Sequence, residues 1–370
     1  MSSLKNIRMI VAGGGTGGHI FPAVSIAHAL KRRFPQAHIL FVGAQGKMEM
    51  EKVPAEGFNI IGLDIVGFDR ANLLKNIQLP WKLWKSFREA GKIIDSFKPD
   101  VVVGVGGYAS FPMLYKAQAK QIPTLIQEQN SFAGKSNVIL GKKAKAVCVA
   151  WPNMERFFPK ERITITGNPV RKSVVETLVP KAEAASFFNL DPNKPIVFAF
   201  GGSLGAKSIN ECLASQFDTL LKHDVQLIWQ TGKLFYKQAC EAVKGHEDNI
   251  IVFDFIRDMN QAYGAADVMV SRAGASSISE LCLIGKPVIF VPFPFASEDH
   301  QTHNARSLSE RGAAELIPND AVDAQLMPAL LNLLQNPERC AQMSHAIRQE
   351  GIADADDRII QTLLSILPNA

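Results

Sequence analysis

Residues 9–19 read MIVAGGGTGGH, and residues 196–206 read IVFAFGGSLGA. Each stretch is a short apolar run that enters a glycine-rich turn, which is typical of a strand leading through a tight loop into a helix. Glycine lets backbone N–H groups approach a ligand closely, and the helix that follows adds its partially positive N-terminus. The sequence therefore predicts a site for phosphate or another oxyanion in each half of the chain, and so two substrates.

The length and composition fit a soluble globular protein of two domains. The chain has 370 residues, of which 47% are hydrophobic and 20% charged, and a domain usually takes ~100–200 residues. The five cysteines are scattered without C-x-x-C spacing, so we expect neither a disulfide framework nor a zinc site, and a reducing compartment. The apolar run before the first glycine turn is too short for a signal peptide. The uncharged run 101–115 is interrupted by glycines and a proline, and it is shorter than the ~18–20 residues that span a membrane.

Short β-branched runs alternate with helix-sized segments throughout the chain. These runs lie at residues 38–42, 101–105, 124–126, 146–149, 163–165, 225–229, 250–253, 267–270 and 287–291. Strands that are apolar along their whole length predict parallel sheets covered on both faces, which is a doubly wound α/β architecture, here present twice. The turn-rich pentad Gly167–Arg171 marks the joint. We therefore expect an N-terminal domain over 1–168, a C-terminal domain over 169–348, and a helix over 349–370 that returns to the first domain.

Three other interpretations of the glycine turns stay open at this stage. Gly13, Gly15 and Gly18 match the dinucleotide fingerprint G-x-G-x-x-G, but residues 42–45 (VGAQ) lack the acidic residue that would hold a ribose. The second turn is a near match to a P-loop, with alanine at position 206 where that motif has glycine. Both stretches can also be plain tight turns, although five glycines among six residues are more than such a turn needs.

Seven motifs in order along nearly the whole chain decide between these interpretations. They are GGTGGH (14–19), GGY (106–108), QEQN (127–130), GNPVR (167–171), GGSLGA (201–206), SRAGA (271–275) with Glu280, and DHQT (299–302) with Asn304. Together they closely resemble the MurG family of bacterial peptidoglycan glycosyltransferases. The resemblance implies the GT-B architecture, in which two Rossmann-like domains face each other across a cleft. It also implies inverting transfer of N-acetylglucosamine from UDP-GlcNAc to the C4 hydroxyl of the N-acetylmuramoyl pentapeptide on undecaprenyl diphosphate, giving lipid II.

By this resemblance the second domain binds UDP-GlcNAc. The turn at 202–206 and the helix after it would hold the diphosphate, with a charge from Arg171. Glu280 would accept hydrogen bonds from the ribose, although it can also be a solvated acid at a helix start. The backbone of Ile256 would pair with uracil beside Met259, in a segment that can equally be the end of a buried strand. The expected donor-binding residues are Arg171, Gly202, Ser203, Leu204, Gly205, Ile256, Met259, Ala275, Ser276, Ser277, Glu280, His300, Gln301 and Asn304.

The first domain would bind the acceptor and supply the catalytic base. The expected acceptor-binding residues are Thr16, Gly17, Gly18, Tyr108, Gln129 and Asn130. His19 is the candidate base, because a neutral imidazole can take a proton near neutral pH, although a histidine at a helix start can also be structural. Glu128 is the rival base or an orienting partner. No D-x-D motif is placed to hold a metal, so no essential cofactor is expected and Mg²⁺ is not implied.

The segment 80–98 predicts a helix with a membrane-binding face. Its core-facing stripe leaves Trp81 on the far side, beside Lys85, Arg88 and Lys92, and an indole among cations suits the headgroups of an anionic membrane. The alternative is a solvated basic helix whose tryptophan covers a loop. The expected membrane patch comprises Leu73, Leu74, Ile77, Leu79, Trp81, Trp84, Lys85, Arg88 and Lys92.

These observations predict a peripheral enzyme on the cytoplasmic face of the bacterial inner membrane. The net charge of +5 is then explained by anionic lipids and phosphorylated substrates, with no nucleic-acid motif present. A cell-wall or division complex is a further expected partner. Two rival functions stay open, namely a GT-B enzyme with another donor or acceptor and a non-catalytic protein that binds nucleotides through the same loops.

Overall fold

The structure is a computed structural model that describes residues 6–65, 79–170, 178–202 and 204–367. It divides into two compact units. The first domain is Met1–Val170 together with Ala353–Ala370, and the second domain is Arg171–Ile352. The first division lies two residues beyond the joint expected from the sequence, and the return to the first domain lies four residues beyond the expected one. The cleft between the domains stays a prediction.

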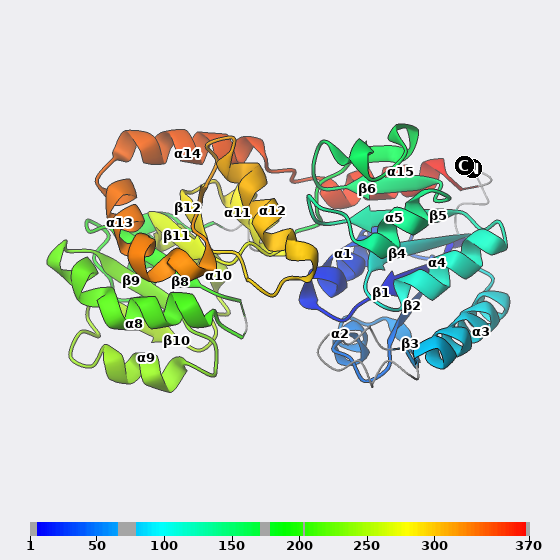
Figure 1. Ribbon diagram of the computed structural model, residues 1–370, viewed down its shortest axis with the longest axis horizontal. Coiled ribbons are helices and arrows are strands. Elements are labelled where there is room, and N and C mark those ends of the chain that lie inside the picture. Colours follow the sequence, from blue (N-terminus) through cyan, green and yellow to red (C-terminus); the bar gives the residue numbers. More distant parts are fainter. Residues whose placement is uncertain (1–5, 66–78, 171–177, 203, 368–370) are drawn as a thin grey trace. The chain divides into compact units, whose positions relative to one another are not determined.

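Each domain is built on one parallel sheet (Figure 1). In the first domain the described strands are ordered β3-β2-β1-β4-β5-β6-β7, and in the second β10-β9-β8-β11-β12-β13. The first sheet comprises β1 (Arg8–Gly13), β2 (His38–Ala44), β3 (Asn59–Leu63), β4 (Val101–Gly106), β5 (Thr124–Glu128), β6 (Ala146–Val149) and β7 (Ile163–Ile165). The second comprises β8 (Ile196–Phe200), β9 (Gln226–Gln230), β10 (Ile250–Phe253), β11 (Val268–Ser271), β12 (Val288–Phe290) and β13 (Glu315–Leu316).

Helices cover both faces of each sheet, as the sequence predicts. In the first domain they are α1 (Gly17–Arg33), α2 (Glu49–Ala55), α3 (Leu79–Phe97), α4 (Ser110–Ala119), α5 (Lys135–Gly141) and α15 (Ala355–Ser365), with short 3₁₀ turns η3 (Met154–Arg156) and η4 (Lys160–Arg162). In the second they are α7 (Lys181–Phe187), α8 (Lys207–Lys222), α9 (Tyr236–Ala242), α10 (Met259–Ala265), α11 (Ala275–Ile284), α12 (His300–Ser309), α13 (Val322–Leu334) and α14 (Pro337–Gln349), with η5 (Ser297–Asp299) and η6 (Asn319–Ala321).

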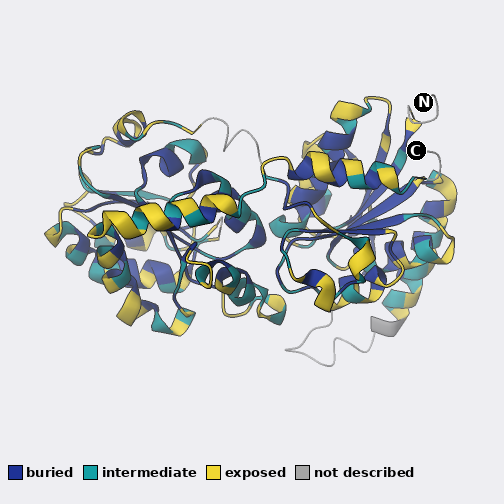
Figure 2. Ribbon diagram, turned by 90° about the horizontal axis from the view of Figure 1, so that it is seen from above, coloured by how far each residue is buried: buried dark blue, intermediate teal, exposed yellow. Residues whose placement is uncertain are grey.

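Alternation along the central strands explains this layering. Successive side chains of a strand point to opposite faces of its sheet. In β1, Met9 and Val11 enter the core on the face of α1, whereas Ile10 and Ala12 enter the core on the face of α4. Figure 2 shows the strands of each domain as buried and the outward faces of the helices as exposed. A strand that is buried on both faces has to be apolar throughout, and this is the pattern that predicted a parallel sheet.

Two edge strands were not predicted. β3 has only five residues, and it contains a glycine and a partly exposed face. β13 has only two residues. Edge strands are paired and packed less than central ones, so their sequences carry a weaker apolar signal.

The C-terminal segment packs in the first domain. Ile359, Ile360 and Leu363 of α15 are buried in the same core as Met9 and Val11. Arg32 of α1 donates to Asp356 at 2.5 Å, which adds an ion pair to this packing. The chain thus leaves the first domain near residue 170 and returns to it near residue 353.

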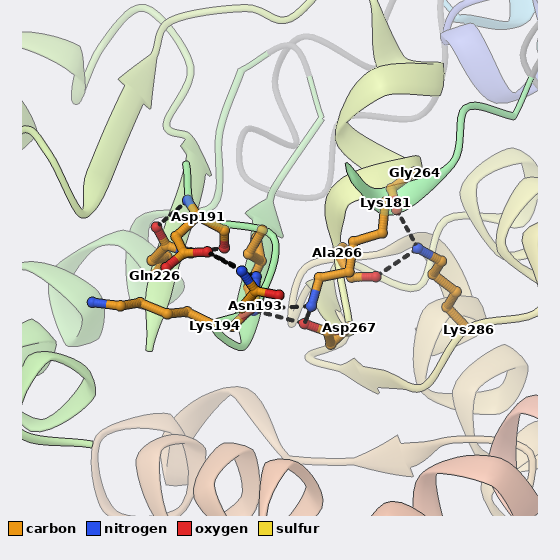
Figure 3. A network of polar contacts seen from close by, with 10 residues as sticks. Lys181, Asp191, Asn193, Lys194, Gln226, Gly264, Ala266, Asp267 and Lys286 are labelled. Carbon is orange, nitrogen blue, oxygen red and sulfur yellow. Dashed lines mark hydrogen bonds and ion pairs between the residues drawn. The ribbon is translucent and has the colours of Figure 1, made fainter. Parts of the chain in front are cut away.

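A polar network fixes the amino ends of the second sheet (Figure 3). Asp267, directly before β11, accepts hydrogen bonds from the backbone N–H of Ile196 at 2.8 Å and from Lys181 Nζ at 2.7 Å. Lys181 also donates to the carbonyl of Lys194 at 3.0 Å. These bonds tie the start of α7 to the starts of β8 and β11, at the edge opposite to the glycine turns.

Lys286 in this network gives a prediction for stability against pH. Its Nζ donates to the carbonyl oxygens of Gly264 and Ala266, both at 2.6 Å, and desolvation lowers its pKa from 10.5 to about 8. Between these two pH values the unfolded chain binds the proton and the folded chain does not, so this residue's contribution to stability rises with pH and is lost as the pH falls through the folded value. We expect the stability of the wild type, relative to Lys286→Met, to rise between pH 7.5 and 9.5 in calorimetric unfolding. Parallel pH profiles for the two proteins would contradict this.

Candidate active site

The predicted acceptor loops lie at one edge of the first sheet. β2, β1, β4 and β5 are neighbours in that order, and all are parallel. Their carboxyl ends therefore meet at the same edge, which is where open α/β sheets bind ligands. The segments that follow these strands carry the expected residues. They are Thr16 and the first turn of α1 (Gly17, Gly18 and His19) after β1, Tyr108 after β4, and Gln129 and Asn130 after β5.

The glycines of the first loop are required by backbone geometry. Gly13, Gly14 and Gly15 have φ of 157°, 143° and 88°, values that residues with a Cβ rarely adopt. The glycine turn after β4 packs directly on this loop, because a Cβ on Gly107 would lie 2.3 Å from the carbonyl oxygen of Gly14. If the first loop were only a tight turn, there would be no reason for Gly106 and Gly107 to pack against it.

Glu49 is a site residue that sequence reasoning missed. It is the first residue of α2 and is 1% exposed. Its Oε2 accepts from the N–H of Gly15 at 2.8 Å, and its Oε1 accepts from the N–H of Ala44 at 2.9 Å. A Cβ on Gly14 or Gly43 would lie within 2.3 or 2.5 Å of this side chain, so glycine at both positions admits it. The glycine in the interior of β2 was the available signal, because it marks a close approach.

The imidazole of His19 is held by the glycine loop. Its Nδ1 lies 3.1 Å from the carbonyl oxygen of Gly14 and 3.3 Å from Thr16 Oγ1. A carbonyl only accepts, so Nδ1 carries the proton in this arrangement and Nε2 is the basic nitrogen. A Cβ on Gly106 would lie 2.8 Å from Nε2, so the glycine of β4 makes room for the ring. The geometry fits the predicted role of general base.

Glu128, expected as a rival base or an orienting partner, has its carboxylate bonded within its own loop. Its carboxylate is 2% exposed and accepts from Asn137 Nδ2 at 2.8 Å, from the N–H and Nδ2 of Asn130 at 3.1 and 3.3 Å, and from the N–H of Gly134 at 3.2 Å. Desolvation by burial raises its pKa despite these donors. Both carboxylate oxygens are thus used inside the loop, which makes Glu128 an organiser of residues 128–137.

Gln129, expected as an acceptor contact, has its amide nitrogen bonded within the first domain. Its side chain is 2% exposed and donates to the carbonyl of Val105 at 2.8 Å and to the side chain of Gln127. Its own carbonyl accepts from Asn168 Nδ2 at 3.0 Å, which links β5 to the domain joint. Tyr108, in contrast, is 48% exposed, so its contact with an acceptor stays a prediction.

The second glycine loop follows β8 in the same way. Gly202 and Gly205 have φ of 78° and 79°, and a Cβ on Gly205 would lie 1.9 Å from the carbonyl oxygen of Thr231. Leu204 is 80% exposed at the tip. The loop leads directly into the N-terminus of α8, where free N–H groups of a first helical turn suit a diphosphate.

Gln230, at the end of β9, joins the predicted diphosphate and uracil segments. Its Nε2 donates to the carbonyl of Gly202 at 3.3 Å, and its Oε1 accepts from the N–H of Ile256 at 2.8 Å. The predicted pairing of Ile256 with uracil therefore rests on the carbonyl oxygen of Ile256, because its N–H already has this partner. Met259, half-buried, begins α10 one turn later. Sequence reasoning missed Gln230.

α11 carries the predicted ribose contact, Glu280, and three other predicted donor-binding residues in its first turn. Glu280 is 8% exposed, and its Oε2 accepts from Tyr263 at 3.2 Å, so the alternative of a solvated acid at the helix start is wrong. Ser276 Oγ is buried and has no hydrogen-bond partner among the described residues. A buried hydroxyl without a partner is costly unless a ligand completes it. Ala275 and Ser277 flank it in the first turn.

The first half of α12 carries three other predicted donor-binding residues, His300, Gln301 and Asn304. His300 Nδ1 donates to the carbonyl of Ser297 at 2.7 Å. Gln301 Oε1 accepts from the N–H of Phe293 at 2.9 Å, so its amide nitrogen is the end that can donate to a hydroxyl. Asn304 is fully buried and lies 3.4 Å from the carbonyl of Ala273, which ties α12 to the turn before α11.

Arg272, quoted in the motif but given no role, is a partly buried cation at the end of β11. It donates to the carbonyls of Val291 at 3.0 Å and Pro292 at 2.9 Å, to Asn319 Oδ1 at 2.7 Å and to Ser208 Oγ at 3.2 Å. All four acceptors are neutral, and desolvation lowers its pKa to about 10. Its charge lies beside the first turn of α8.

The outer face of α3 carries the described part of the predicted membrane patch. Trp81 and Trp84 are 66% and 53% exposed and stack with ring centroids 5.2 Å apart, and Arg88 lies over Trp84 at 5.9 Å. Lys92 is exposed on the same helix. Lys85 is not a free surface cation, because it contacts Asp64 at 3.3 Å and the helix neighbour Glu89 at 3.9 Å.

An aromatic cluster lies between α3 and α4. The Phe87 ring contacts the rings of Tyr115 at 5.2 Å and Phe111 at 6.1 Å, and Tyr115 is 49% exposed.

In the described ranges, no helix has both the length and the apolarity of a bilayer-spanning segment.

Several predicted residues lie outside the described part of the chain. They are Leu73, Leu74, Ile77, Arg171 and Ser203, together with the side chain of Leu79. Among the residues that are described, no group of three or more histidines, cysteines or carboxylates is placed to hold a metal ion.

Two doubly wound domains, each with a glycine loop at the carboxyl edge of its sheet, define the class as a GT-B glycosyltransferase fold. The model of the glycosyltransferase family 28 N-terminal domain matches residues 9–149, and that of the family 28 C-terminal domain matches residues 196–359. The chain belongs to glycosyltransferase family 28.

Relatives match the chain over nearly its full length. It is 49% identical to the UDP-N-acetylglucosamine--N-acetylmuramyl-(pentapeptide) pyrophosphoryl-undecaprenol N-acetylglucosamine transferase of Parabacteroides distasonis, over 98% of this chain and 99% of that one. It is also 49% identical to the transferase of the same name from Cytophaga hutchinsonii, over 99% of both chains. The crystal structure of Acinetobacter baumannii MurG superposes with a TM-score of 0.79 at 29% identity, covering 97% of this chain and 99% of that one.

Proposed function

We propose that this chain transfers N-acetylglucosamine from UDP-GlcNAc to the C4 hydroxyl of an N-acetylmuramoyl pentapeptide carried on undecaprenyl diphosphate. The observation that carries the proposal is the 49% identity, over 98% of the chain, with a transferase whose name states these substrates. A likeness that spans both domains covers the loops for both substrates. A rival GT-B enzyme would share the fold without this full-length identity.

The second domain binds the donor in this proposal. The N-terminus of α8 and the glycine loop hold the diphosphate, and Arg272 adds a fixed positive charge beside them. Glu280, held by Tyr263, accepts from the ribose hydroxyls. The hydroxyl of Ser276, which has no hydrogen-bond partner among the described residues, gains one when the donor binds.

The first domain supplies the base in this proposal. The C4 oxygen forms its bond to the anomeric carbon as the bond from that carbon to the UDP oxygen breaks, and Nε2 of His19 takes the hydroxyl proton. Inversion follows from this single displacement, which needs no covalent intermediate. The helix N-terminus neutralises the leaving diphosphate, so the proposal includes no essential metal.

A donor and acceptor panel tests this function. The purified chain is incubated with UDP-GlcNAc, UDP-glucose or GDP-mannose and a lipid-diphosphate-linked muramoyl pentapeptide, and the product is identified by mass spectrometry. We expect a disaccharide only with UDP-GlcNAc. Transfer from another nucleotide sugar would support a different GT-B enzyme, and UDP binding without any transfer would support the non-catalytic rival.

We also propose that the outer face of α3, with Tyr115 of α4, docks on an anionic membrane. Stacked, exposed tryptophans beside cations suit the headgroup region, where an indole and a basic side chain both gain. Docking through this surface would bring the enzyme to an acceptor that is carried on a membrane lipid. Because Lys85 is paired, Lys92 and Arg88 are the cations that carry the attraction.

The variant Trp81→Ala with Lys92→Glu tests this surface. Each basic residue near an anionic membrane contributes ~1 kcal/mol, so the charge reversal and the lost indole are expected to reduce vesicle binding by about tenfold or more. Binding of the wild type should also weaken with salt, because the attraction is screened. Sedimentation with phosphatidylglycerol vesicles measures both effects. Activity on a short-chain, water-soluble acceptor should stay near that of the wild type.

A matched control carries two changes of the same kind on the second domain, namely loss of an exposed aromatic ring and reversal of a lysine charge. Phe187 is 54% exposed and Lys244 has a 74% exposed side chain, so Phe187→Ala with Lys244→Glu also removes an exposed aromatic ring and makes the same change in charge. We expect this control to sediment like the wild type. Equal vesicle binding by all three proteins at moderate salt would remove the surface from the mechanism.

A further inference from the structure

The peptide group between Gly14 and Gly15 has both of its polar atoms bonded to side chains. Its N–H, that of Gly15, donates to Glu49 Oε2 at 2.8 Å. Its carbonyl, that of Gly14, lies 3.1 Å from His19 Nδ1. One peptide unit therefore connects a buried carboxylate to the imidazole of the proposed base.

We propose that Glu49 is a positioning residue for His19 and acts through this peptide group. The hydrogen bond from the Gly15 N–H to the carboxylate polarises the peptide group, so its carbonyl oxygen becomes a stronger acceptor for the Nδ1 proton. Hydrogen bonds in series strengthen one another by about 10–30% per bond. A proton held at Nδ1 leaves Nε2 as the base. The arrangement does the work of a carboxylate that bonds a histidine directly, with one peptide interposed.

The surroundings of Glu49 support this role over a purely local one. Its second oxygen is fixed by the N–H of Ala44 at 2.9 Å, so the carboxylate cannot rotate away from the loop. The space that the side chain occupies requires glycine at positions 14 and 43, because a Cβ added there would lie only 2.3 and 2.5 Å from Glu49. A negative charge at the N–H of Gly15 also disfavours a phosphate there, which leaves this peptide to the histidine.

Thr16 competes for the same nitrogen and has to be weighed. Its Oγ1 lies 3.3 Å from His19 Nδ1, farther than the carbonyl at 3.1 Å. With the proton on Nδ1, the hydroxyl accepts as a second, weaker partner. If Thr16 donated instead, Nδ1 would be unprotonated and would face the carbonyl of Gly14 with a lone pair, which is repulsive. The carbonyl therefore decides the tautomer.

The tautomer of His19 is the direct test, and it does not require activity. In protein labelled with ¹⁵N-histidine, two-bond ¹H–¹⁵N correlations at pH 8 distinguish the two neutral tautomers, and the His19 signal is assigned by its absence in His19→Gln. We expect the Nδ1–H form in the wild type and a larger share of the Nε2–H form in Glu49→Gln, because the Gly14 carbonyl, no longer polarised by a carboxylate, holds the Nδ1 proton more weakly. Glu51→Gln, an exposed acid on the same helix, should match the wild type.

The kinetic test rests on the proposed function. We expect Glu49→Gln to lower kcat at least tenfold, and by less than the loss of His19 itself, with an unchanged KM for UDP-GlcNAc. If the wild-type protein itself showed the Nε2–H tautomer, the inference would be overturned, even if Glu49→Gln fails to fold. If Glu49→Gln folds and has the same tautomer or the same kcat as the wild type, the inference is also overturned. If no acceptor is glycosylated, the proposed function fails while the tautomer still decides the role of Glu49.

Discussion

His19→Ala is expected to lower kcat by about 10²–10⁴-fold, which is the usual contribution of a general base. The loop geometry assigns the proton to Nδ1 and the lone pair to Nε2, so the ring is already in the form that accepts a hydroxyl proton. Donor binding should persist, because the donor residues belong to the other domain. Steady-state kinetics at saturating acceptor and calorimetric titration with UDP-GlcNAc measure the two quantities separately.

The same helix supplies a matched control for this prediction. His28 lies on α1, its side chain is 44% exposed, and it contacts Glu56 at 3.3 Å. We expect His28→Ala to turn over like the wild type. Near wild-type turnover of His19→Ala would rule out this residue as the base. A far larger loss for Glu128→Gln, in a variant that keeps its fold, would then restore Glu128 as the candidate.

The central strands and the glycine turns could be predicted because their causes are local. A strand buried on both faces has to be apolar throughout, as in residues 196–200, and a backbone with φ near 80° at Gly202 or Gly205 has to be glycine. β3 and β13 could not be predicted in this way. They are short edge strands that are positioned by pairing with β2 and β12, and their sequences show little of the apolar pattern that predicts a strand.

The polar partners of the loops could not be predicted from spacing. Glu49 lies 34 residues from Gly15 in the sequence, and only the pairing of β1 with β2 brings its helix to the glycine loop. Gln129 was expected at the acceptor, and Glu128 as a rival base or an orienting partner, only because the motif at residues 127–130 resembles that of a known family. In the structure they face inward and satisfy backbone groups of their own loops, which buried polar groups have to do.

Glu280→Ala is expected to weaken UDP binding by about 10- to 150-fold. Hydrogen bonds to a charged group contribute about 1.5–3 kcal/mol, and every 1.4 kcal/mol is tenfold in Kd. Glu280 is 8% exposed and is held by Tyr263 at 3.2 Å, so its carboxylate is positioned before the ribose arrives. Tyr263→Phe keeps the carboxylate and removes its holder, so a smaller loss of affinity is expected for it.

A modified ligand separates the ribose contact from any general effect of the substitution. The wild type should bind UDP more tightly than 2′,3′-dideoxy-UDP by about the same 10- to 150-fold. Glu280→Ala should bind the two ligands equally, because it lacks the carboxylate that accepts from the ribose hydroxyls. Glu241→Ala, with a 79% exposed side chain on α9, is the control that should retain the wild-type preference. Isothermal titration calorimetry measures all six affinities. If Glu280→Ala kept the preference for UDP, the ribose would be bound elsewhere, and the buried carboxylate would serve only to hold Tyr263 in the core of the second domain.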